Sequence, residues 1–267
     1  MFRQPAVAGQ FYSDDPEVLR AELSRLIKRS PEPIEAKMVV APHAGYMYSG
    51  WVAGEVYGRI RPPEVAVVLG PNHTGLGASA AIVSYGAFLT PLGEVPIEST
   101  LAEKIMEEAP ILREDHLAHL YEHSLEVQLP FLQYLQPEIS LVPICLGRLS
   151  AEEIEDLGKG LGRAIAGYPS RVLLVASTDF SHYVPHEIAQ RKDQRAIERI
   201  LALDPLGLLE VVVREDISMC GVIPTAVALT AARLLGASRA ELVRYATSGE
   251  VSGDYARVVG YAGILIW

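Results

Sequence analysis

The stretch Lys37–Gly50, KMVVAPHAGYMYSG, decides the fold class of this chain. Its run Met38–Ala41 is apolar, partly β-branched and short, which is typical of a buried strand. Pro42 and Gly45 end the strand, because proline lacks a backbone donor and glycine adopts angles that other residues avoid. His43 therefore lies at the carboxyl end of a strand, where open α/β sheets bind ligands. It is a candidate metal ligand or acid/base; a histidine that only completes a turn is the plainer alternative.

The same arrangement occurs twice more along the chain. The apolar run 65–70 is followed by proline, asparagine and His73, and the apolar run 171–177 leads within five residues to His182. The carboxyl ends of parallel neighbouring strands meet at one edge of a sheet. If these strands are parallel neighbours, we expect His43, His73 and His182 to face one crevice.

The composition is that of an ordinary globular chain, and it argues against nucleic acid as a partner. The chain has 267 residues, of which 49% are hydrophobic and 21% charged, so we expect one α/β domain over residues 1–267. A net charge of −10 without a basic stripe argues against nucleic-acid binding. We see no secretory signal and no apolar run of the roughly 18 residues that span a bilayer, and therefore expect a cytoplasmic protein. Two cysteines do not make a disulfide framework, which fits a reducing compartment.

Strand and helix patterns alternate along the whole chain. This predicts a mostly parallel central sheet with helices on both faces. Further strands are predicted over 78–83, 140–146, 241–247 and 255–267, with loops at 90–96 and 248–253. Helices are predicted over 16–27, 50–59, 101–109, 114–135, 152–166, 185–203, 206–213 and 222–235. Pro130 requires a break, a kink or a new helix start near it, inside the helix predicted over 114–135. Residues 1–12 read as an ordered arm whose aromatic side chains pack or line a site.

A separate motif, His119-Leu120-Tyr121-Glu122-His123, has the H-x-x-E-H pattern of inverted zinc proteases. On one helix the two histidines would share a face and a zinc ion, with Glu122 as base. No third ligand is marked, and chance clustering with His116 is the alternative. His123 and Glu126, three residues apart, could instead reach the crevice and support a ligand; an ordinary exposed helix face is the alternative.

The two cysteines differ in their predicted surroundings. Cys145 lies inside an apolar strand, where a free thiol behaves as a small hydrophobe. Cys220 directly precedes a predicted helix, whose amino terminus is expected to lower the thiol pKa and favour the metal-binding thiolate. We therefore favour Cys220 over Cys145 as a ligand. Two histidines and a thiolate suit iron, copper or zinc. His182 would add an acid/base imidazole and Asp179 a carboxylate that orients it, unless Asp179 only caps its turn.

The same residues carry a family likeness that runs nearly from end to end. Five motifs occur in order: APHAGY from residue 41, GPNH at 70–73, EHSLEVQLPFL at 122–132, STDFSHY at 177–183 and MCG at 219–221. Together with AGQFY near the N-terminus and SGDY and VVGYAG near the end, they resemble the MEMO family (mediator of cell motility). That family is similar in fold to the class III extradiol dioxygenases, non-haem iron enzymes that open catechol rings.

The resemblance implies a specific metal site. Iron(II) is the first choice, with copper or zinc as alternatives, and the ligands would be His43, His73 and Cys220. His182 would stand in the place of the dioxygenases' acid/base histidine. The supporting residues would be Asp179, His123 and Glu126. The dioxygenases have a carboxylate where this chain has Cys220, so dioxygenase activity does not simply carry over.

Three functions remain open at this point. The first is a metal-dependent redox or oxygenase-like enzyme. The second is a binding module whose crevice holds a peptide or small ligand without turnover, and the third is the H-x-x-E-H zinc protease. By resemblance, animal members bind phosphotyrosine peptides, and microbial members are associated with AMMECR1-type and radical SAM proteins. None of these partners is indicated by the residues themselves.

Overall fold

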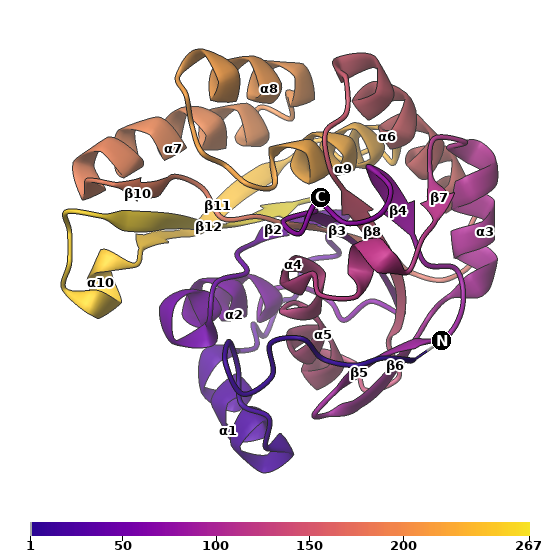
Figure 1. The fold of residues 1–267 in the computed structure, drawn as a ribbon, viewed down its shortest axis with the longest axis horizontal. Coiled ribbons are helices and arrows are strands. Elements are labelled where there is room, and N and C mark those ends of the chain that lie inside the picture. The colour runs from indigo at the N-terminus through magenta and orange to yellow at the C-terminus, as the bar shows by residue number, and fades with distance from the viewer. Residues whose placement is uncertain (1) are drawn as a thin grey trace.

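The computed structural model describes residues 2–267, and the centre of its main sheet is parallel, as predicted (Figure 1). Within these residues nine strands form this sheet, in the order β10-β12-β2-β9-β3-β8-β4-β7, with β11 beside β12. The four parallel strands are β2 (Met38–Ala41), β9 (Val172–Ser177), β3 (Val65–Pro71) and β8 (Ser140–Leu146). On either side of these four lie β12 (Val258–Ile266) and β4 (Ala80–Ile82), which run antiparallel to β2 and β8, respectively. The remaining strands of the sheet are β7 (Arg113–Glu114), β10 (His182–Val184) and β11 (Ala240–Thr247).

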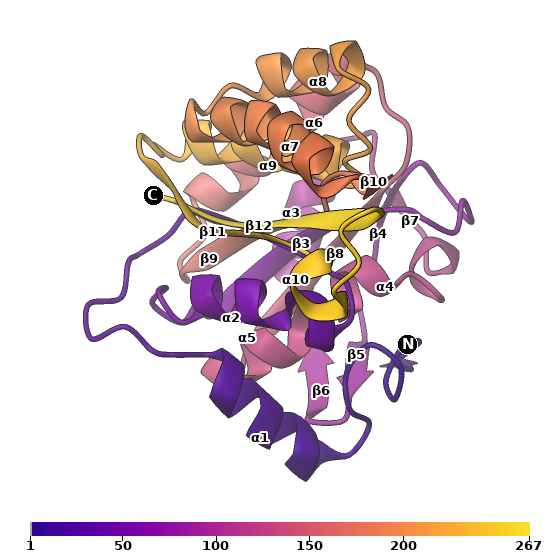
Figure 2. The ribbon, with the colours of Figure 1, turned by 90° about the vertical axis from the view of Figure 1, so that its left-hand side faces the viewer.

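Helices cover both faces of this sheet, which confirms the predicted α/β domain (Figure 2). One face carries α3 (Ser99–Glu108), α6 (Ala151–Ala166), α7 (His186–Leu201), α8 (Pro205–Arg214) and α9 (Val222–Leu234). The other carries α1 (Pro16–Leu26), α2 (Trp51–Tyr57), α4 (His123–Glu126) and α5 (Leu129–Leu135). Within residues 2–267, no helix combines the length and the apolar character that crossing a membrane requires.

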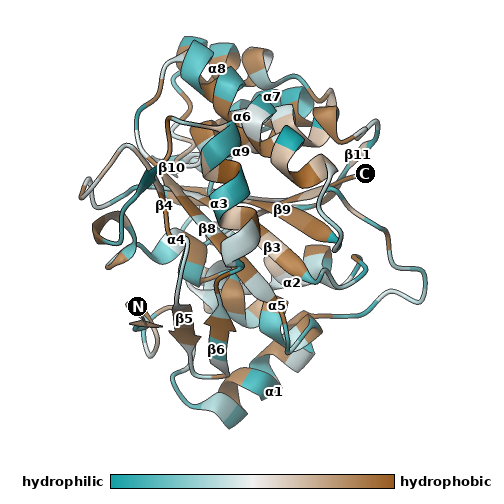
Figure 3. Cartoon of the chain, turned by 90° about the vertical axis from the view of Figure 1, so that its right-hand side faces the viewer, coloured by the Kyte–Doolittle hydropathy of each residue, from teal (hydrophilic) through white to brown (hydrophobic). Residues whose placement is uncertain are grey.

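Apart from a serine at one end of β8 and of β9, the central strands are apolar, because both of their faces are buried (Figure 3). In β2, Met38 and Val40 pack into the core beneath α9, whereas Val39 and Ala41 pack into the core on the opposite face. The alternation follows from the period of two residues along a strand. The helix expected after β2 begins earlier than predicted, with one turn of π-helix over Tyr46–Gly50 that leads into α2. Such turns recur near functional sites.

The predicted loop at 90–96 is wrong, because this segment is a β-hairpin. It joins β5 (Ala87–Thr90) to β6 (Gly93–Pro96), and β1 (Phe2–Arg3) adds a third strand to this small sheet. Phe88 and Val95 stand opposite each other and are both buried, so tertiary burial stabilises strands too short to give a clear sequence pattern. The predicted loop at 248–253 likewise contains a helical turn, α10 (Gly249–Ser252).

The long helix predicted over 114–135 is also wrong, and its absence separates the two histidines of the H-x-x-E-H motif. His119 ends a 3-10 turn (Leu117–His119), while His123 begins α4. Between them Glu122 is extended, with ψ 123°, and its side chain caps α4 by accepting from the Ser124 N–H. The two rings therefore do not share one helix face, and the expected zinc pair is not formed. Only the new helix start near Pro130 is confirmed, since α5 has this proline in its first turn.

Glu126 is fully buried and fixes the N-terminal arm. Its Oε2 lies 2.8 Å from Nη1 of Arg3, which is 4% exposed. The carboxylate also accepts from the N–H groups of Ala6 and Val7, at 2.7 and 3.0 Å, and from the Tyr12 hydroxyl at 2.6 Å. A buried charge is tolerated when all of its lone pairs are satisfied in this way. Glu126 thus closes the arm onto α4.

We predict that Glu126→Ala destabilises the protein by about 3–5 kcal/mol, because Arg3 is then left buried without its partner. Denaturant unfolding measures this loss. The control is Glu241→Ala, which breaks the half-exposed pair between Arg59 and Glu241, 2.8 Å apart, and should cost less than about 1 kcal/mol. Equal losses in the two variants would contradict the prediction.

We also predict that His119 makes the protein less stable in mild acid. Its ring is 2% exposed and lies at 79° to the ring of Phe88, and burial, with a smaller contribution from Arg3, lowers the pKa of His119 to about 3. The folded protein keeps this ring neutral, whereas an unfolded chain protonates it below about pH 6.5. The stabilising effect is therefore complete above pH 6.5 and is lost as the pH falls toward 3, by up to about 1.4 kcal/mol per pH unit.

The measurement is the free energy of unfolding at several pH values between 6.5 and 4.5 for the parent and for His119→Leu. The variant should lose less stability over this range than the parent. Parallel curves would show that His119 does not contribute to the pH dependence.

Candidate metal centre

A crevice of ≈ 740 Å³ opens at the carboxyl ends of the parallel strands. His43 follows β2, His73 follows β3, and His182 comes five residues after the end of β9; all three line this crevice. Since β9 pairs with both β2 and β3, the loops that carry these residues must meet at one edge of the sheet.

His123 completes a cluster with His43 and His73. Each of the three offers one ring nitrogen, and these nitrogens all lie within 4.8 Å of one another. The ring centroids of His43 and His73 are 5.2 Å apart, and those of His73 and His123 are 4.7 Å apart. His123 enters from the first residue of α4 and not from a strand end. The cluster is thus assembled from two strand ends and one helix start.

Glu122 holds His73 in place through two hydrogen bonds. Its Oε1 lies 2.8 Å from His73 Nδ1, and its Oε2 accepts from the His73 N–H at 2.6 Å. Burial raises the pKa of Glu122, but the hydrogen bonds from His73 and from the Ser124 N–H outweigh this and lower it to about 2. The ionised carboxylate only accepts, so His73 Nδ1 carries a proton and donates it to Glu122. The sequence marked Glu122 only as a protease base.

Burial disfavours the charged form of His43 and of His123. Burial, together with neighbouring His123, His73 and His182, lowers the pKa of His43 well below its usual range. Burial also lowers the pKa of His123. Neutral imidazoles have a lone pair for a metal, and imidazole suits iron, copper and zinc. The donor set therefore fits a transition-metal ion.

Cys220 adjoins the cluster on the side of His43. Its Sγ lies 3.3 Å from His43 Nε2. Nitrogen and sulfur ligands of one tetrahedral ion stand about 3.5 Å apart, given bond lengths of about 2.0 and 2.3 Å. The expected lowering of the thiol pKa is wrong for the metal-free protein, because burial and the charge of Asp179 raise the pKa of Cys220 to about 12. Cys145 is buried, and burial raises its pKa, as expected for a small hydrophobe.

Asp179 and His182 are placed differently from one another. Asp179 is buried, and its Oδ1 accepts from the backbone N–H of His43 at 2.9 Å. Burial raises the pKa of Asp179 to about 6.

His182 Nδ1 lies 2.9 Å from the carbonyl oxygen of Ser218, which can only accept. Nε2 of His182 is therefore free to take up a proton. Ser218 had no signal in the sequence, because it contacts the His182 ring through its own backbone carbonyl and lies 36 residues further along the chain.

Besides the histidines, several aromatic side chains line the crevice. Phe11, from the arm that Glu126 fixes, lies edge-on to His123 with ring centroids 5.0 Å apart. Tyr48 and Tyr183 also line the crevice, and the Arg257 guanidinium lies 5.5 Å from the centre of the Tyr183 ring. This agrees with the expectation that aromatic side chains of the arm line a site. Glu126 itself acts behind these side chains.

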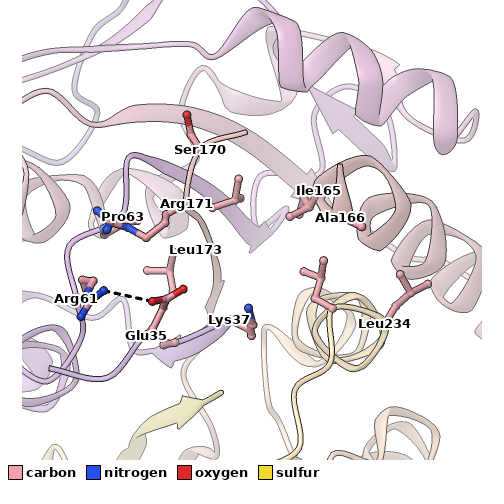
Figure 4. A pocket seen from close by; sticks show the side chains of 13 residues that line it. Glu35, Lys37, Arg61, Pro63, Ile165, Ala166, Ser170, Arg171, Leu173 and Leu234 are labelled. Atoms are coloured by element: carbon pink, nitrogen blue, oxygen red, sulfur yellow. Dashed lines mark hydrogen bonds and ion pairs between the residues drawn. The ribbon is translucent and has the colours of Figure 1, made fainter. Parts of the chain in front are cut away.

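A second hollow, of ≈ 370 Å³, lies at the opposite, amino-terminal ends of β2 and β9 (Figure 4). It is lined by Lys37, Arg61 and Arg171 with aliphatic side chains such as Leu234. Arg61 pairs with Glu35 at 3.4 Å. No imidazole or thiol among the described residues lines this hollow, whereas His43, His73 and His123 line the crevice at the carboxyl edge of the sheet.

Comparison with known proteins gives a consistent result over the full chain. The family model described as Memo-like protein matches residues 3–265. MEMO1 family proteins from Methanopyrus kandleri and Methanothermobacter thermautotrophicus are 46% and 43% identical, over 99% and 98% of this chain and 99% of each relative. One from Aquifex aeolicus is 45% identical over 98% of both chains.

One solved structure, that of an uncharacterized protein from Escherichia coli K12, aligns with 84% of this chain and 98% of its own. Its TM-score is 0.49 and its identity 15%, a likeness too distant to carry an argument. The family therefore rests on the sequence match, which extends over all five motifs. This chain belongs to the MEMO1 family of Memo-like proteins.

Proposed function

We propose that this chain is a metalloprotein that binds iron or copper at the carboxyl edge of its sheet and performs redox or oxygenase-like chemistry there. The observation that carries the proposal is the convergence of three imidazole nitrogens within 4.8 Å of one another. His43, His73 and Cys220 would hold the ion, and His123 would offer a further nitrogen. When bound, such an ion supplies Lewis-acid and one-electron redox chemistry.

The protein's own residues would prepare the crevice for a small organic substrate. Phe11, Tyr48 and Tyr183 offer apolar faces against which such a substrate can pack. His182, with Nδ1 held by Ser218, would take up or return a proton through Nε2. Asp179 would keep the His43 backbone in place through its hydrogen bond of 2.9 Å.

A binding module without turnover is the second candidate. Its support is the size and lining of the crevice, ≈ 740 Å³ with several aromatic side chains, which could hold a peptide or small ligand without any metal. Binding that persists after complete metal removal would favour this candidate over the first. A zinc protease of the H-x-x-E-H type needs both histidines on one helix face. His119 and His123 belong to different helical segments, so this arrangement is not formed.

We predict near-stoichiometric iron or copper in protein purified without oxygen, and loss of most of it in His43→Ala and His73→Ala. His123→Ala should bind more weakly, and Cys220→Ser should lose the thiolate-to-metal charge-transfer band of the cobalt-substituted protein. Elemental analysis and absorption spectroscopy measure these changes.

The control is His116→Ala, which removes a partly exposed imidazole that pairs with Glu114 at 3.3 Å and does not line the crevice. It should keep the metal content of the parent. A parent that cannot be loaded with any of these metals, or a metal content that no crevice variant changes, would contradict the proposed function.

A further inference from the structure

A chain of buried hydrogen bonds runs from Tyr57 to the metal-centre ring of His43. Its members are Tyr57, Gln128 and Ser177, and the side chains of all three are fully buried. They come from three separate elements: α2, the residue before α5, and the last residue of β9. The last contact of the chain joins Ser177 Oγ to His43 Nδ1, 2.9 Å apart.

The direction of that contact decides which ring nitrogen of His43 carries the proton. A serine hydroxyl can donate or accept, so the contact by itself is ambiguous. The hydroxyl of Ser177, however, also lies 2.6 Å from the carbonyl oxygen of Ser124, which can only accept. Its one proton is used there, and towards His43 the oxygen must accept.

Gln128 supplies the second constraint. Its Nε2 donates to Ser177 Oγ at 2.8 Å and to the carbonyl oxygen of Pro42 at 2.9 Å. Its Oε1 accepts from the Tyr57 hydroxyl at 2.8 Å. Reversing the amide would place two oxygens face to face at Pro42, so the orientation of Gln128 is determined by its surroundings. Ser177 therefore has one donor from Gln128 and needs its other donor from His43.

We propose that Ser177 and Gln128 are positioning residues that hold His43 as the Nδ1–H tautomer and so aim its Nε2 lone pair at the metal position. This rests on the proposed function and deepens it. His73 Nδ1 is likewise held as a donor, by the carboxylate of Glu122, whereas His43 is held by a neutral chain. Asp179 fixes the backbone of His43 from the other side, so neither ring nor main chain can turn without breaking a buried hydrogen bond.

The first test reads the tautomer in the metal-free protein. Nitrogen NMR of 15N-histidine-labelled protein distinguishes Nδ1–H from Nε2–H, and His43→Gln identifies the His43 signals among the seven histidines. The parent should show Nδ1–H at His43. Ser177→Ala should shift a large fraction to Nε2–H, and Ser177→Thr, which keeps the hydroxyl, should restore the parent spectrum. Nε2–H in the parent would overturn the assignment.

The second test measures cobalt(II) affinity in the same variants. Ser177→Ala should weaken binding by about 10–100-fold, the usual cost of losing an outer hydrogen-bond partner, and Ser177→Thr should recover it. Gln128→Met should weaken binding to a smaller extent and serves in place of Ser177→Ala if that variant does not fold. The matched control is Gln133→Met, because Gln133 is also a buried glutamine that meets a hydroxyl, that of Thr90, but lies outside the chain to His43.

The two tests separate the two proposals. A parent that binds no cobalt would remove the metal function, while a tautomer shift in Ser177→Ala would still support the positioning role at His43. Unchanged tautomer and affinity in a folded Ser177→Ala would overturn the positioning role. Equal losses in Gln128→Met and Gln133→Met would also overturn it, because they would indicate general destabilisation.

Discussion

The parallel pairing of β9 with β2 on one side and β3 on the other is the constraint on which the rest of this structure depends. The register places Ala41 opposite Ser177 and Leu69 opposite Ala176, so the three strands stop at nearly the same level. The residues that follow them are therefore neighbours in space. A slip of one residue would turn each side chain to the opposite face of the sheet. Burial of both faces by separate cores prevents such a slip.

Beneath the crevice the protein keeps polar groups where apolar packing would be simpler. Glu122, Gln128, Ser177 and Asp179 are all buried, and each is hydrogen-bonded to the backbone or ring of a crevice residue or to a neighbour in the same network. An unpaired buried polar group is costly, so a network of this kind stabilises one arrangement and penalises every partly broken one. Such a layer specifies ring orientation, which apolar contacts alone would leave free to rotate.

The segment from residue 114 to residue 135 shows how this layer overrides local preference. Its composition is helical, yet the chain is extended at Glu122, where the carboxylate binds His73 and caps α4 at the same time. This break directs His123 toward the crevice and leaves His119 inside the fold. The hairpin at 87–96 is a similar case, since its strands are fixed by burial of Phe88 and Val95 and by the added strand β1. Neither outcome could be read from neighbouring residues.

The sequence by itself determined the fold class, the central strands, the histidines that follow them and the family likeness. These features depend on period, composition and motif order, which are local properties of a chain. Only the tertiary structure decided that His123 joins His43 and His73, that Glu126 fixes the N-terminal arm, and that the Cys220 thiol is protonated without a metal. Arg3 and Glu126 are 123 residues apart, and Cys220 and His43 are 177 apart. Such contacts, and the burial that shifts a pKa, exist only once distant segments have packed together.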